Sequence, residues 1–224
     1  MSVWKSKSAL GLTTGSERSD ARHNGMIPVS HGLSTGTRVA SNLGWRAVEA
    51  LAVGDSVLTF DNNMQKIVAI RQTALWVDAT DVPMHQWPVY VPLGVLGNRT
   101  DLTLLPEQGV MVESQAAMDV HGDPFAVIPA EALDGFHGIF RCPPDYQTTM
   151  ITLYFENEEV IYTEGGFLVH CPRPVIQLDD MLSDRSPTYE VLNMHDATFL
   201  VECLDLEDQM GDEYTQSVAM VGNC

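Results

Sequence analysis

The sequence predicts an all-β fold built from hairpins. From about residue 33 to residue 170, short runs of Val, Ile, Leu and Thr alternate with turns that contain Gly, Pro or Asn, which is typical of antiparallel strands. Apolar residues rarely recur at the 3.6-residue spacing of a helix in the same stretch. The apolar fraction of 45% is sufficient for a buried core.

The expected strands follow one another closely along the chain. They lie at residues 37–40, 56–60, 67–70, 88–92, 150–155, 160–163 and 167–169. Polar turns at Asp61–Asn63 and Glu156–Glu158 predict local antiparallel pairing within residues 56–70 and 150–163.

Two short helical turns interrupt the strands. They are expected at Val48–Leu51 and Pro129–Leu133, each of which leads into a turn with Gly or Asp. Their sequences are similar, as in an internal duplication, but they align only with a gap.

Composition divides the chain into three parts. Residues 1–30 are rich in Ser, Thr, Gly, Arg and Lys and predict a flexible leader. Residues 31–172 form the predicted domain, and residues 173–224 form an acidic C-terminal extension with two basic and eleven acidic side chains. Within the extension we expect short elements at residues 175–182 and 189–194, a strand at 197–203 and a solvated tail at 205–224.

The overall charge excludes several classes of protein. Twelve basic and 30 acidic residues give a net charge of −18, which argues against a nucleic-acid-binding protein. No apolar run is long enough for a membrane-spanning helix, and the first residues do not form a secretory signal peptide. We expect a cytoplasmic protein, or one exported without a cleavable N-terminal signal. The four cysteines form no CxxC pair, so they predict free thiols.

One short motif suggests a serine hydrolase. Gly32–Gly36 fits the G-x-S-x-G nucleophile pattern with Ser34 at its centre, and His31 precedes it. A working elbow needs a buried strand before the serine and a helix after it. Here a polar leader precedes the motif and a predicted strand follows, so this interpretation is an alternative only.

Candidate metal ligands have unsuitable spacing. His121 with Asp123, His137, and His170 with Cys171 do not fall on one helical face or one strand face. The acidic residues at 205–213 do not follow the alternating pattern of a calcium-binding loop. We therefore expect neither a metal nor a cofactor.

Three ordered blocks resemble the Hint superfamily of Hedgehog and intein autoprocessing domains. The first covers Leu33–Val39 and Gly44–Leu58, and its run Val48–Val57 reads V-E-x-L-x-x-G-D-x-V. The second, Leu104–Val112, is similar to the block that contains T-P-x-H, and the third, Glu164–Cys171, to the terminal block that ends in V-H-N. The nearest relatives resemble bacterial Hint domains of the alphaproteobacterial type. The resemblance implies a compact, curved fold of hairpins with pseudo-twofold halves.

The family chemistry needs residues that this chain mostly lacks. In the family, a Cys, Ser or Thr attacks the preceding peptide carbonyl, and a His in the second block protonates the departing nitrogen. These positions fall on Gly32 and Gln108, and the family's threonine falls on Leu105. The terminal Asn falls on Cys171, so His170 is the one catalytic-type residue in place.

The resemblance therefore implies a catalytically silent Hint-like domain that acts as a non-enzymatic scaffold or interaction module for an unidentified protein partner. Active autoprocessing is the first alternative, with Ser34 or Ser30 as a displaced nucleophile or with an attack by Cys171. Under that alternative the candidate catalytic residues are His170, Cys171 and Ser34.

Overall fold

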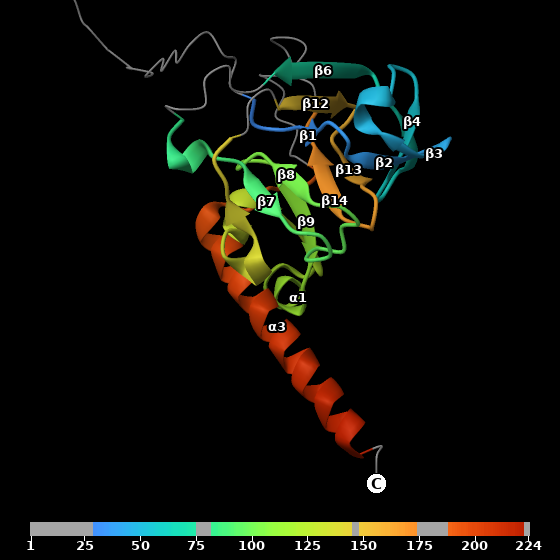
Figure 1. Ribbon diagram of the computed structural model, residues 1–224. Helices are drawn as coiled ribbons and strands as arrows, with labels where there is room; N and C mark the ends of the chain where they lie inside the picture. Colours follow the sequence, from blue (N-terminus) through green and yellow to red (C-terminus); the bar gives the residue numbers. More distant parts are fainter. Residues whose placement is uncertain (1–28, 75–81, 145–147, 174–187, 222–224) are drawn as a thin grey trace, which may run out of the picture.

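The computed structural model describes residues 29–74, 82–144, 148–173 and 188–221 (Figure 1). These residues form two antiparallel sheets that share one core, which confirms the all-β prediction. The six-stranded sheet has the order β11-β7-β8-β1-β12-β6. The second sheet has the order β10-β9-β14-β13-β4-β2-β3, with β5 paired to β4.

The strands are short, and their bounds follow. The first sheet contains β1 (Leu33–Ser34), β6 (Ala69–Ala74), β7 (Val89–Val91), β8 (Leu102–Leu104), β11 (Phe140–Arg141) and β12 (Thr149–Tyr154). The second contains β2 (Arg38–Ser41), β3 (Gly44–Ala47), β4 (Ser56–Thr59), β5 (Asn63–Lys66), β9 (Gly109–Glu113), β10 (Phe125–Pro129), β13 (Glu159–Tyr162) and β14 (Leu168–Cys171).

One of the two predicted hairpins is confirmed. β4 and β5 pair around the polar turn, with Thr59 opposite Asn63. The predicted pairing within residues 150–163 is wrong, because β12 pairs with β6 and β1 while β13 pairs with β14 and β4. The turn at Glu156–Glu158 therefore carries the chain from one sheet to the other, and the register of β12 is set by six residue pairs with the distant β6.

Both predicted helical turns exist as 3-10 helices. The segment η1 (Val48–Ala50) follows the β2–β3 hairpin, and η4 (Ala130–Leu133) follows the paired strands β9 and β10. Each buries apolar residues against the core. Two further 3-10 helices, η3 (Met84–Gln86) and η5 (Phe136–Gly138), lie in connecting segments.

Helix α1 (Gln115–His121) was not expected from the sequence. Ser114 caps its N-terminus, since its hydroxyl accepts hydrogen bonds from the N–H groups of Ala116 and Ala117. Gly122 ends the helix in the left-handed conformation, with φ of 77°, which glycine adopts without steric cost.

The C-terminal extension differs most from the prediction. Helix α3 (Met194–Val221) replaces both the strand expected at 197–203 and the solvated tail expected from residue 205. The β-forming residue types of the first segment suggested a strand, but its apolar side chains recur at helical spacing, so that a helix buries them on one face. The buried positions are Ala197, Leu200, Val201 and the partly buried Leu204, all packed into the main core cluster. The element expected at 175–182 and residues 1–28 of the leader lie outside the described residues.

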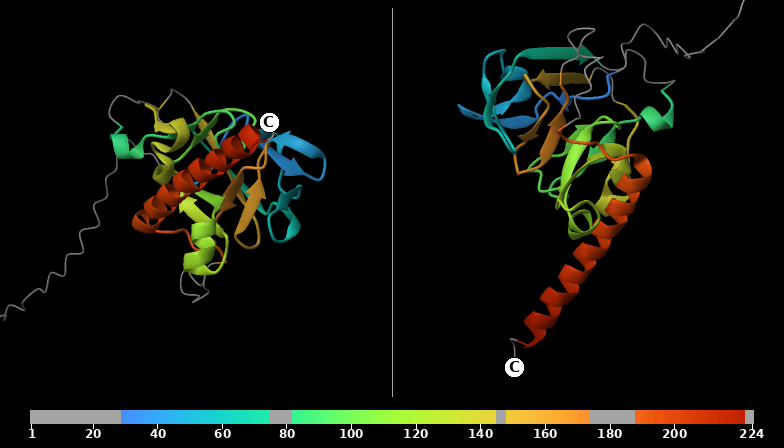
Figure 2. Two further views of the ribbon diagram at one scale, coloured as in Figure 1. Left: turned by 90° about the horizontal axis from the view of Figure 1, so that it is seen from below. Right: turned by 180° about the vertical axis from the view of Figure 1, so that it is seen from behind.

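Helix α3 crosses the body and then extends beyond it (Figures 1 and 2). Asn193 caps its start by accepting a hydrogen bond from the Asp196 N–H at 3.1 Å. Along the body it contacts α1, β10 and η4. None of the helices within the described ranges is both long and apolar enough to cross a membrane.

Candidate functional site

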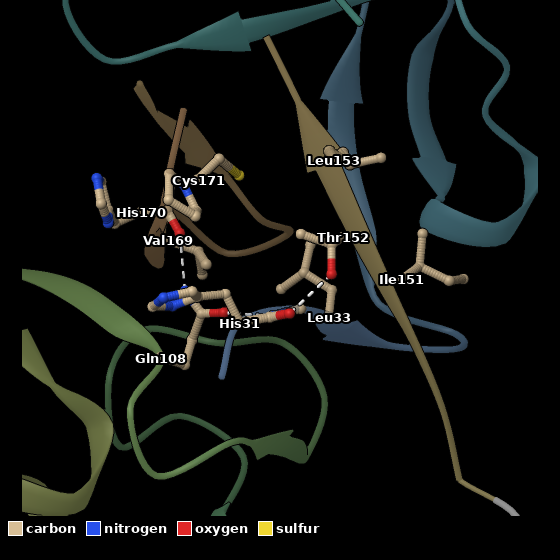
Figure 3. Close-up of a pocket in the computed structure, with 11 residues that line it drawn as sticks. His31, Leu33, Gln108, Ile151, Thr152, Leu153, Val169, His170 and Cys171 are labelled. Carbon is tan, nitrogen blue, oxygen red and sulfur yellow. Dashed lines mark hydrogen bonds between the residues drawn. The ribbon is translucent and has the colours of Figure 1, made fainter. Parts of the chain in front are cut away.

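The peptide bond between His31 and Gly32 is held at both of its polar groups. The Gly32 N–H donates to Gln108 Oε1 at 2.8 Å, and the Thr152 hydroxyl donates to the His31 carbonyl at 2.7 Å. Gln108 precedes β9 and Thr152 lies in β12, so the two sheets approach this bond from different sides (Figure 3). The sequence resemblance places the family's cleavable bond at this peptide.

Gln108 also connects the site to the end of β14. Its Nε2 donates to the carbonyl oxygens of Gly109 at 3.0 Å and His170 at 2.8 Å. These two bonds require the amide nitrogen to face β14 and leave the amide oxygen for Gly32. Since the side chain is 1% exposed, water does not replace these partners.

Gly32 has no side chain, and a Cβ at this position would be crowded. A Cβ there would lie 3.2 Å from Thr152 Oγ1 and 3.3 Å from Met150 Cβ, both tighter than ordinary contacts. The φ of 155° at Gly32 is also one that other residues rarely adopt. The backbone conformation is therefore adapted to glycine.

His170 is buried, and its surroundings keep it neutral. Its side chain packs on Gly109, where a Cβ would come within 2.9 Å of His170 Cβ. Burial lowers the pKa of His170, and Glu158 opposes this effect only in part. Glu158 Oε2 lies 3.5 Å from His170 Nε2, which is too long for a normal hydrogen bond.

His31 is the second imidazole of the site and is partly buried. Burial is the largest cause that lowers the pKa of His31, and the neighbouring His170 lowers it further, while Glu107 opposes them. Within the described residues, His31 Nδ1 and both ring nitrogens of His170 have no hydrogen-bond partner. Two neutral imidazoles therefore share a site that disfavours protonation.

The segment that leads into α3 covers His170. The backbone N–H groups of Thr188 and Tyr189 donate to Glu158 Oε1. The Tyr189 ring stands edge-on to the His170 ring, with centroids 6.0 Å apart. Leu192 N–H then donates to the Val127 carbonyl at 2.8 Å. Glu158 thus faces the imidazole with one oxygen and holds the covering segment with the other.

Cys171 lies beside the site as a buried thiol. Burial, with a smaller contribution from Glu159, raises the pKa of the Cys171 thiol to about 12. The thiolate is the nucleophilic form of cysteine, so Cys171 is not activated at neutral pH.

The small pocket at this site contains two of the three predicted catalytic residues, His170 and Cys171. It leaves about 10 Å³ for the centre of a water molecule, which is room for about one water. The residues that line it are His31, Gly32, Leu33, Gln108, Ile151, Thr152, Leu153, Val169, His170, Cys171 and Pro172 (Figure 3).

Ser34 is not among the residues that line this pocket. It lies in β1 opposite Met150, and its Oγ is 3.3 Å from Thr37 Oγ1. A turn and strand β2 follow it, whereas a nucleophile elbow continues into a helix.

Thr152 and Glu158 are site residues that sequence reasoning missed. Thr152 is a polar residue within the apolar run of β12, at 5% exposure, and a buried hydroxyl in such a run indicates a specific partner. Glu158 was assigned to a turn, and no local signal indicates its contact with His170.

The candidate metal ligands are dispersed. In the described parts of the chain no three His, Cys, Asp or Glu side chains are arranged to hold a metal ion. His137 instead contacts Asp205 at 3.2 Å and Asp208 at 3.8 Å. Glu207 accepts hydrogen bonds from Ser114 Oγ and from the first N–H groups of α1. The segment weighed as a calcium loop is therefore helical, and the carboxylates of Asp205, Glu207 and Asp208 make contacts within the protein.

Comparison with known proteins agrees with the sequence resemblance. Residues 31–168 match the model of the Hint domain family. No curated protein matches the chain. A bacterial intein-like domain from Clostridium thermocellum is similar in structure, with 12% identity, a TM-score of 0.46, and 63% of this chain and 99% of that domain covered. The AceL NrdHF class 3 split intein, a splice-inactive variant, has 15% identity, a TM-score of 0.41, and coverage of 64% and 99%. The gp41-1 intein has 12% identity, a TM-score of 0.39, and coverage of 62% and 97%.

Proposed function

Because this chain belongs to the Hint domain family, we propose that it is a Hint domain which no longer cleaves its own backbone and serves as a non-enzymatic scaffold or interaction module. The observation that carries this proposal is the held peptide bond. Gln108 and Thr152 bind the N–H and the carbonyl of the 31–32 peptide, while position 32 is a glycine.

Each step of self-cleavage lacks a group in this site. Acyl transfer requires a side-chain nucleophile one residue after the scissile carbonyl, and Gly32 has no side chain. The departing nitrogen requires a proton, but the Gln108 amide oxygen accepts a hydrogen bond from that nitrogen and an amide is not an acid near neutral pH. At the C-terminal end, Cys171 replaces the asparagine and its thiol stays protonated.

What remains of the machinery is a clamp. Gln108 joins the backbone at Gly32 to the backbone at His170 through one side chain. The clamp therefore holds residue 31, where the domain begins, next to residue 170, near its end. A scaffold that keeps these two chain segments together needs tight, stable contacts rather than reactivity.

Active autoprocessing is the second candidate, and one contact favours it. The Thr152 hydroxyl lies 2.7 Å from the His31 carbonyl oxygen, where a donor would stabilise the negative charge that develops during attack. A displaced nucleophile, Ser34 or Cys171, would still have to reach the carbonyl carbon.

Intact mass spectrometry of the full chain tests the proposal. The protein is incubated from pH 6 to pH 9, with and without a thiol or hydroxylamine. We expect one unchanged mass throughout. Fragments cut near residues 29–34 or 170–172 that disappear on Ser34→Ala or Cys171→Ala would overturn it, and the Thr152→Val variant would then measure the contribution of the hydroxyl. Labelling of the intact chain by a serine-directed phosphonate, lost on Ser34→Ala, would instead show a serine hydrolase.

A further inference from the structure

The side of α3 that faces away from the body carries an apolar stripe. Phe199, Leu206 and Met210 are 54%, 59% and 70% exposed, and the half-buried Cys203 lies between the first two. These four residues form the outer stripe. Their spacing of four, three and four residues places them on one helical face, opposite the buried face. Large apolar side chains gathered on one exposed face indicate a binding surface.

Helix α3 extends past the part that contacts the body. It contacts α1, β10 and η4, and His137 contacts Asp208 near its middle. It continues to Val221, away from the sheets (Figures 1 and 2). Isolated helices shorter than about 12 to 15 residues are marginal in water. A partner on the outer stripe, whose last residue is Met210, would stabilise the helix up to the point where it leaves the body.

The charge of α3 determines the chemistry of that partner. Residues 194–221 contain seven acidic residues and no Lys or Arg, so no ion pairs along the helix offset their repulsion. A second copy of α3 would add seven more carboxylates and no cation. The fitting partner is an apolar segment with Lys or Arg beside it and without acidic residues.

The first twelve residues of this chain have that composition. They contain Val3, Trp4, Leu10 and Leu12 together with Lys5 and Lys7, and the first acidic residue of the chain is Glu17. We propose that residues 1–12 bind the outer stripe of α3 in the same molecule. Apolar side chains cover the stripe, and the two lysines lie near the carboxylates that flank it, such as Glu202.

Sixteen residues connect the proposed docking segment to the body of the protein. Val29 packs against Leu105 and Met150, and residues 13–28 separate it from the proposed docking segment. Sixteen residues span at most about 55 Å, and a helix of 28 residues is about 42 Å long. The connecting segment can therefore span more than the full length of the helix.

Cys203 makes the proposal directly testable in the full-length protein. The Ser8→Cys variant is prepared in a Cys224→Ala background and treated with a short bismaleimide at low protein concentration. Non-reducing electrophoresis and peptide mass spectrometry then identify the linked pairs. We expect a monomer in which position 8 is joined to Cys203, as the main product. At 0.5 M salt this product should fall at least threefold, since charge attraction contributes to binding.

A matched pair of double variants separates docking from simple proximity. Leu206→Glu with Met210→Glu should reduce the position 8 to Cys203 product at least fivefold. Leu43→Glu with Val53→Glu, at positions on the body that are 70% and 62% exposed, should leave it unchanged. Circular dichroism confirms that each variant is folded. Equal linking in both variants, no linking at all, or dimers joined through two Cys203 residues would each overturn the proposal, and the last would assign the stripe to a second copy.

Discussion

Gln108 is the residue whose replacement most directly tests the clamp. In Gln108→Leu the side chain keeps a similar size but loses three hydrogen bonds, to Gly32 N–H, Gly109 C=O and His170 C=O. A buried hydrogen bond contributes about 1 kcal/mol net, and a buried donor left without an acceptor costs more. We therefore expect the free energy of unfolding to fall by about 3 kcal/mol, with a decrease in Tm of about 6 to 12 °C.

Urea unfolding followed by tryptophan fluorescence measures this change. The control is Gln65→Leu, since Gln65 is partly exposed and its Nε2 makes a single bond to the Asn62 carbonyl at 2.6 Å. We expect this control to lower the free energy of unfolding by less than about 1 kcal/mol. If Gln108→Leu lies within the same range as the control, the amide does not hold the two chain ends together and the clamp argument fails.

Three further results are expected. Burial lowers the pKa of His31 and His170 below their ordinary value of 6.5, so below about pH 6.5 the unfolded chain binds protons that the folded protein excludes. The free energy of unfolding should be highest above that pH and fall as the pH drops, by at most about 1.4 kcal/mol per pH unit for each imidazole. A Tm that stays constant from pH 7 to pH 5 would contradict this. Glu207→Ala removes a carboxylate that accepts hydrogen bonds at the N-terminus of α1 and should lower the free energy of unfolding in urea by about 1 kcal/mol. The exposed control Glu202→Ala should lower it much less, and equal losses would show that the cap contributes nothing. Tyr189→Ala uncovers one side of His170. Carbethoxylation of His170 by diethyl pyrocarbonate, followed by peptide mass spectrometry, should therefore be several-fold faster than in Glu202→Ala. An unchanged rate would mean that Tyr189 does not shield the imidazole.

Much of the scaffold was predictable because its signals are local. Short apolar runs separated by polar turns indicate hairpins, and the β4–β5 pair formed as expected. The partners of β12 were not predictable, since it pairs with strand β6, which lies about eighty positions earlier in the chain. The first turns of α3 show a different limit. Their residue types favour a strand, and only the core cluster that receives Ala197, Leu200 and Val201 makes the helical arrangement the one that buries them.

The residue types on which the proposed loss of activity rests were determined by the sequence alone. A glycine at position 32 and a glutamine at position 108 lack the required chemistry in any conformation. The arrangement of what remains was decided only by the tertiary structure. Thr152 is 121 residues from His31 and Gln108 is 76 residues from Gly32, and the side chains meet because two sheets fold over one peptide bond. Residue types are local properties of the chain, whereas hydrogen-bond partners, burial and the pKa of a histidine depend on which distant segments the core brings together.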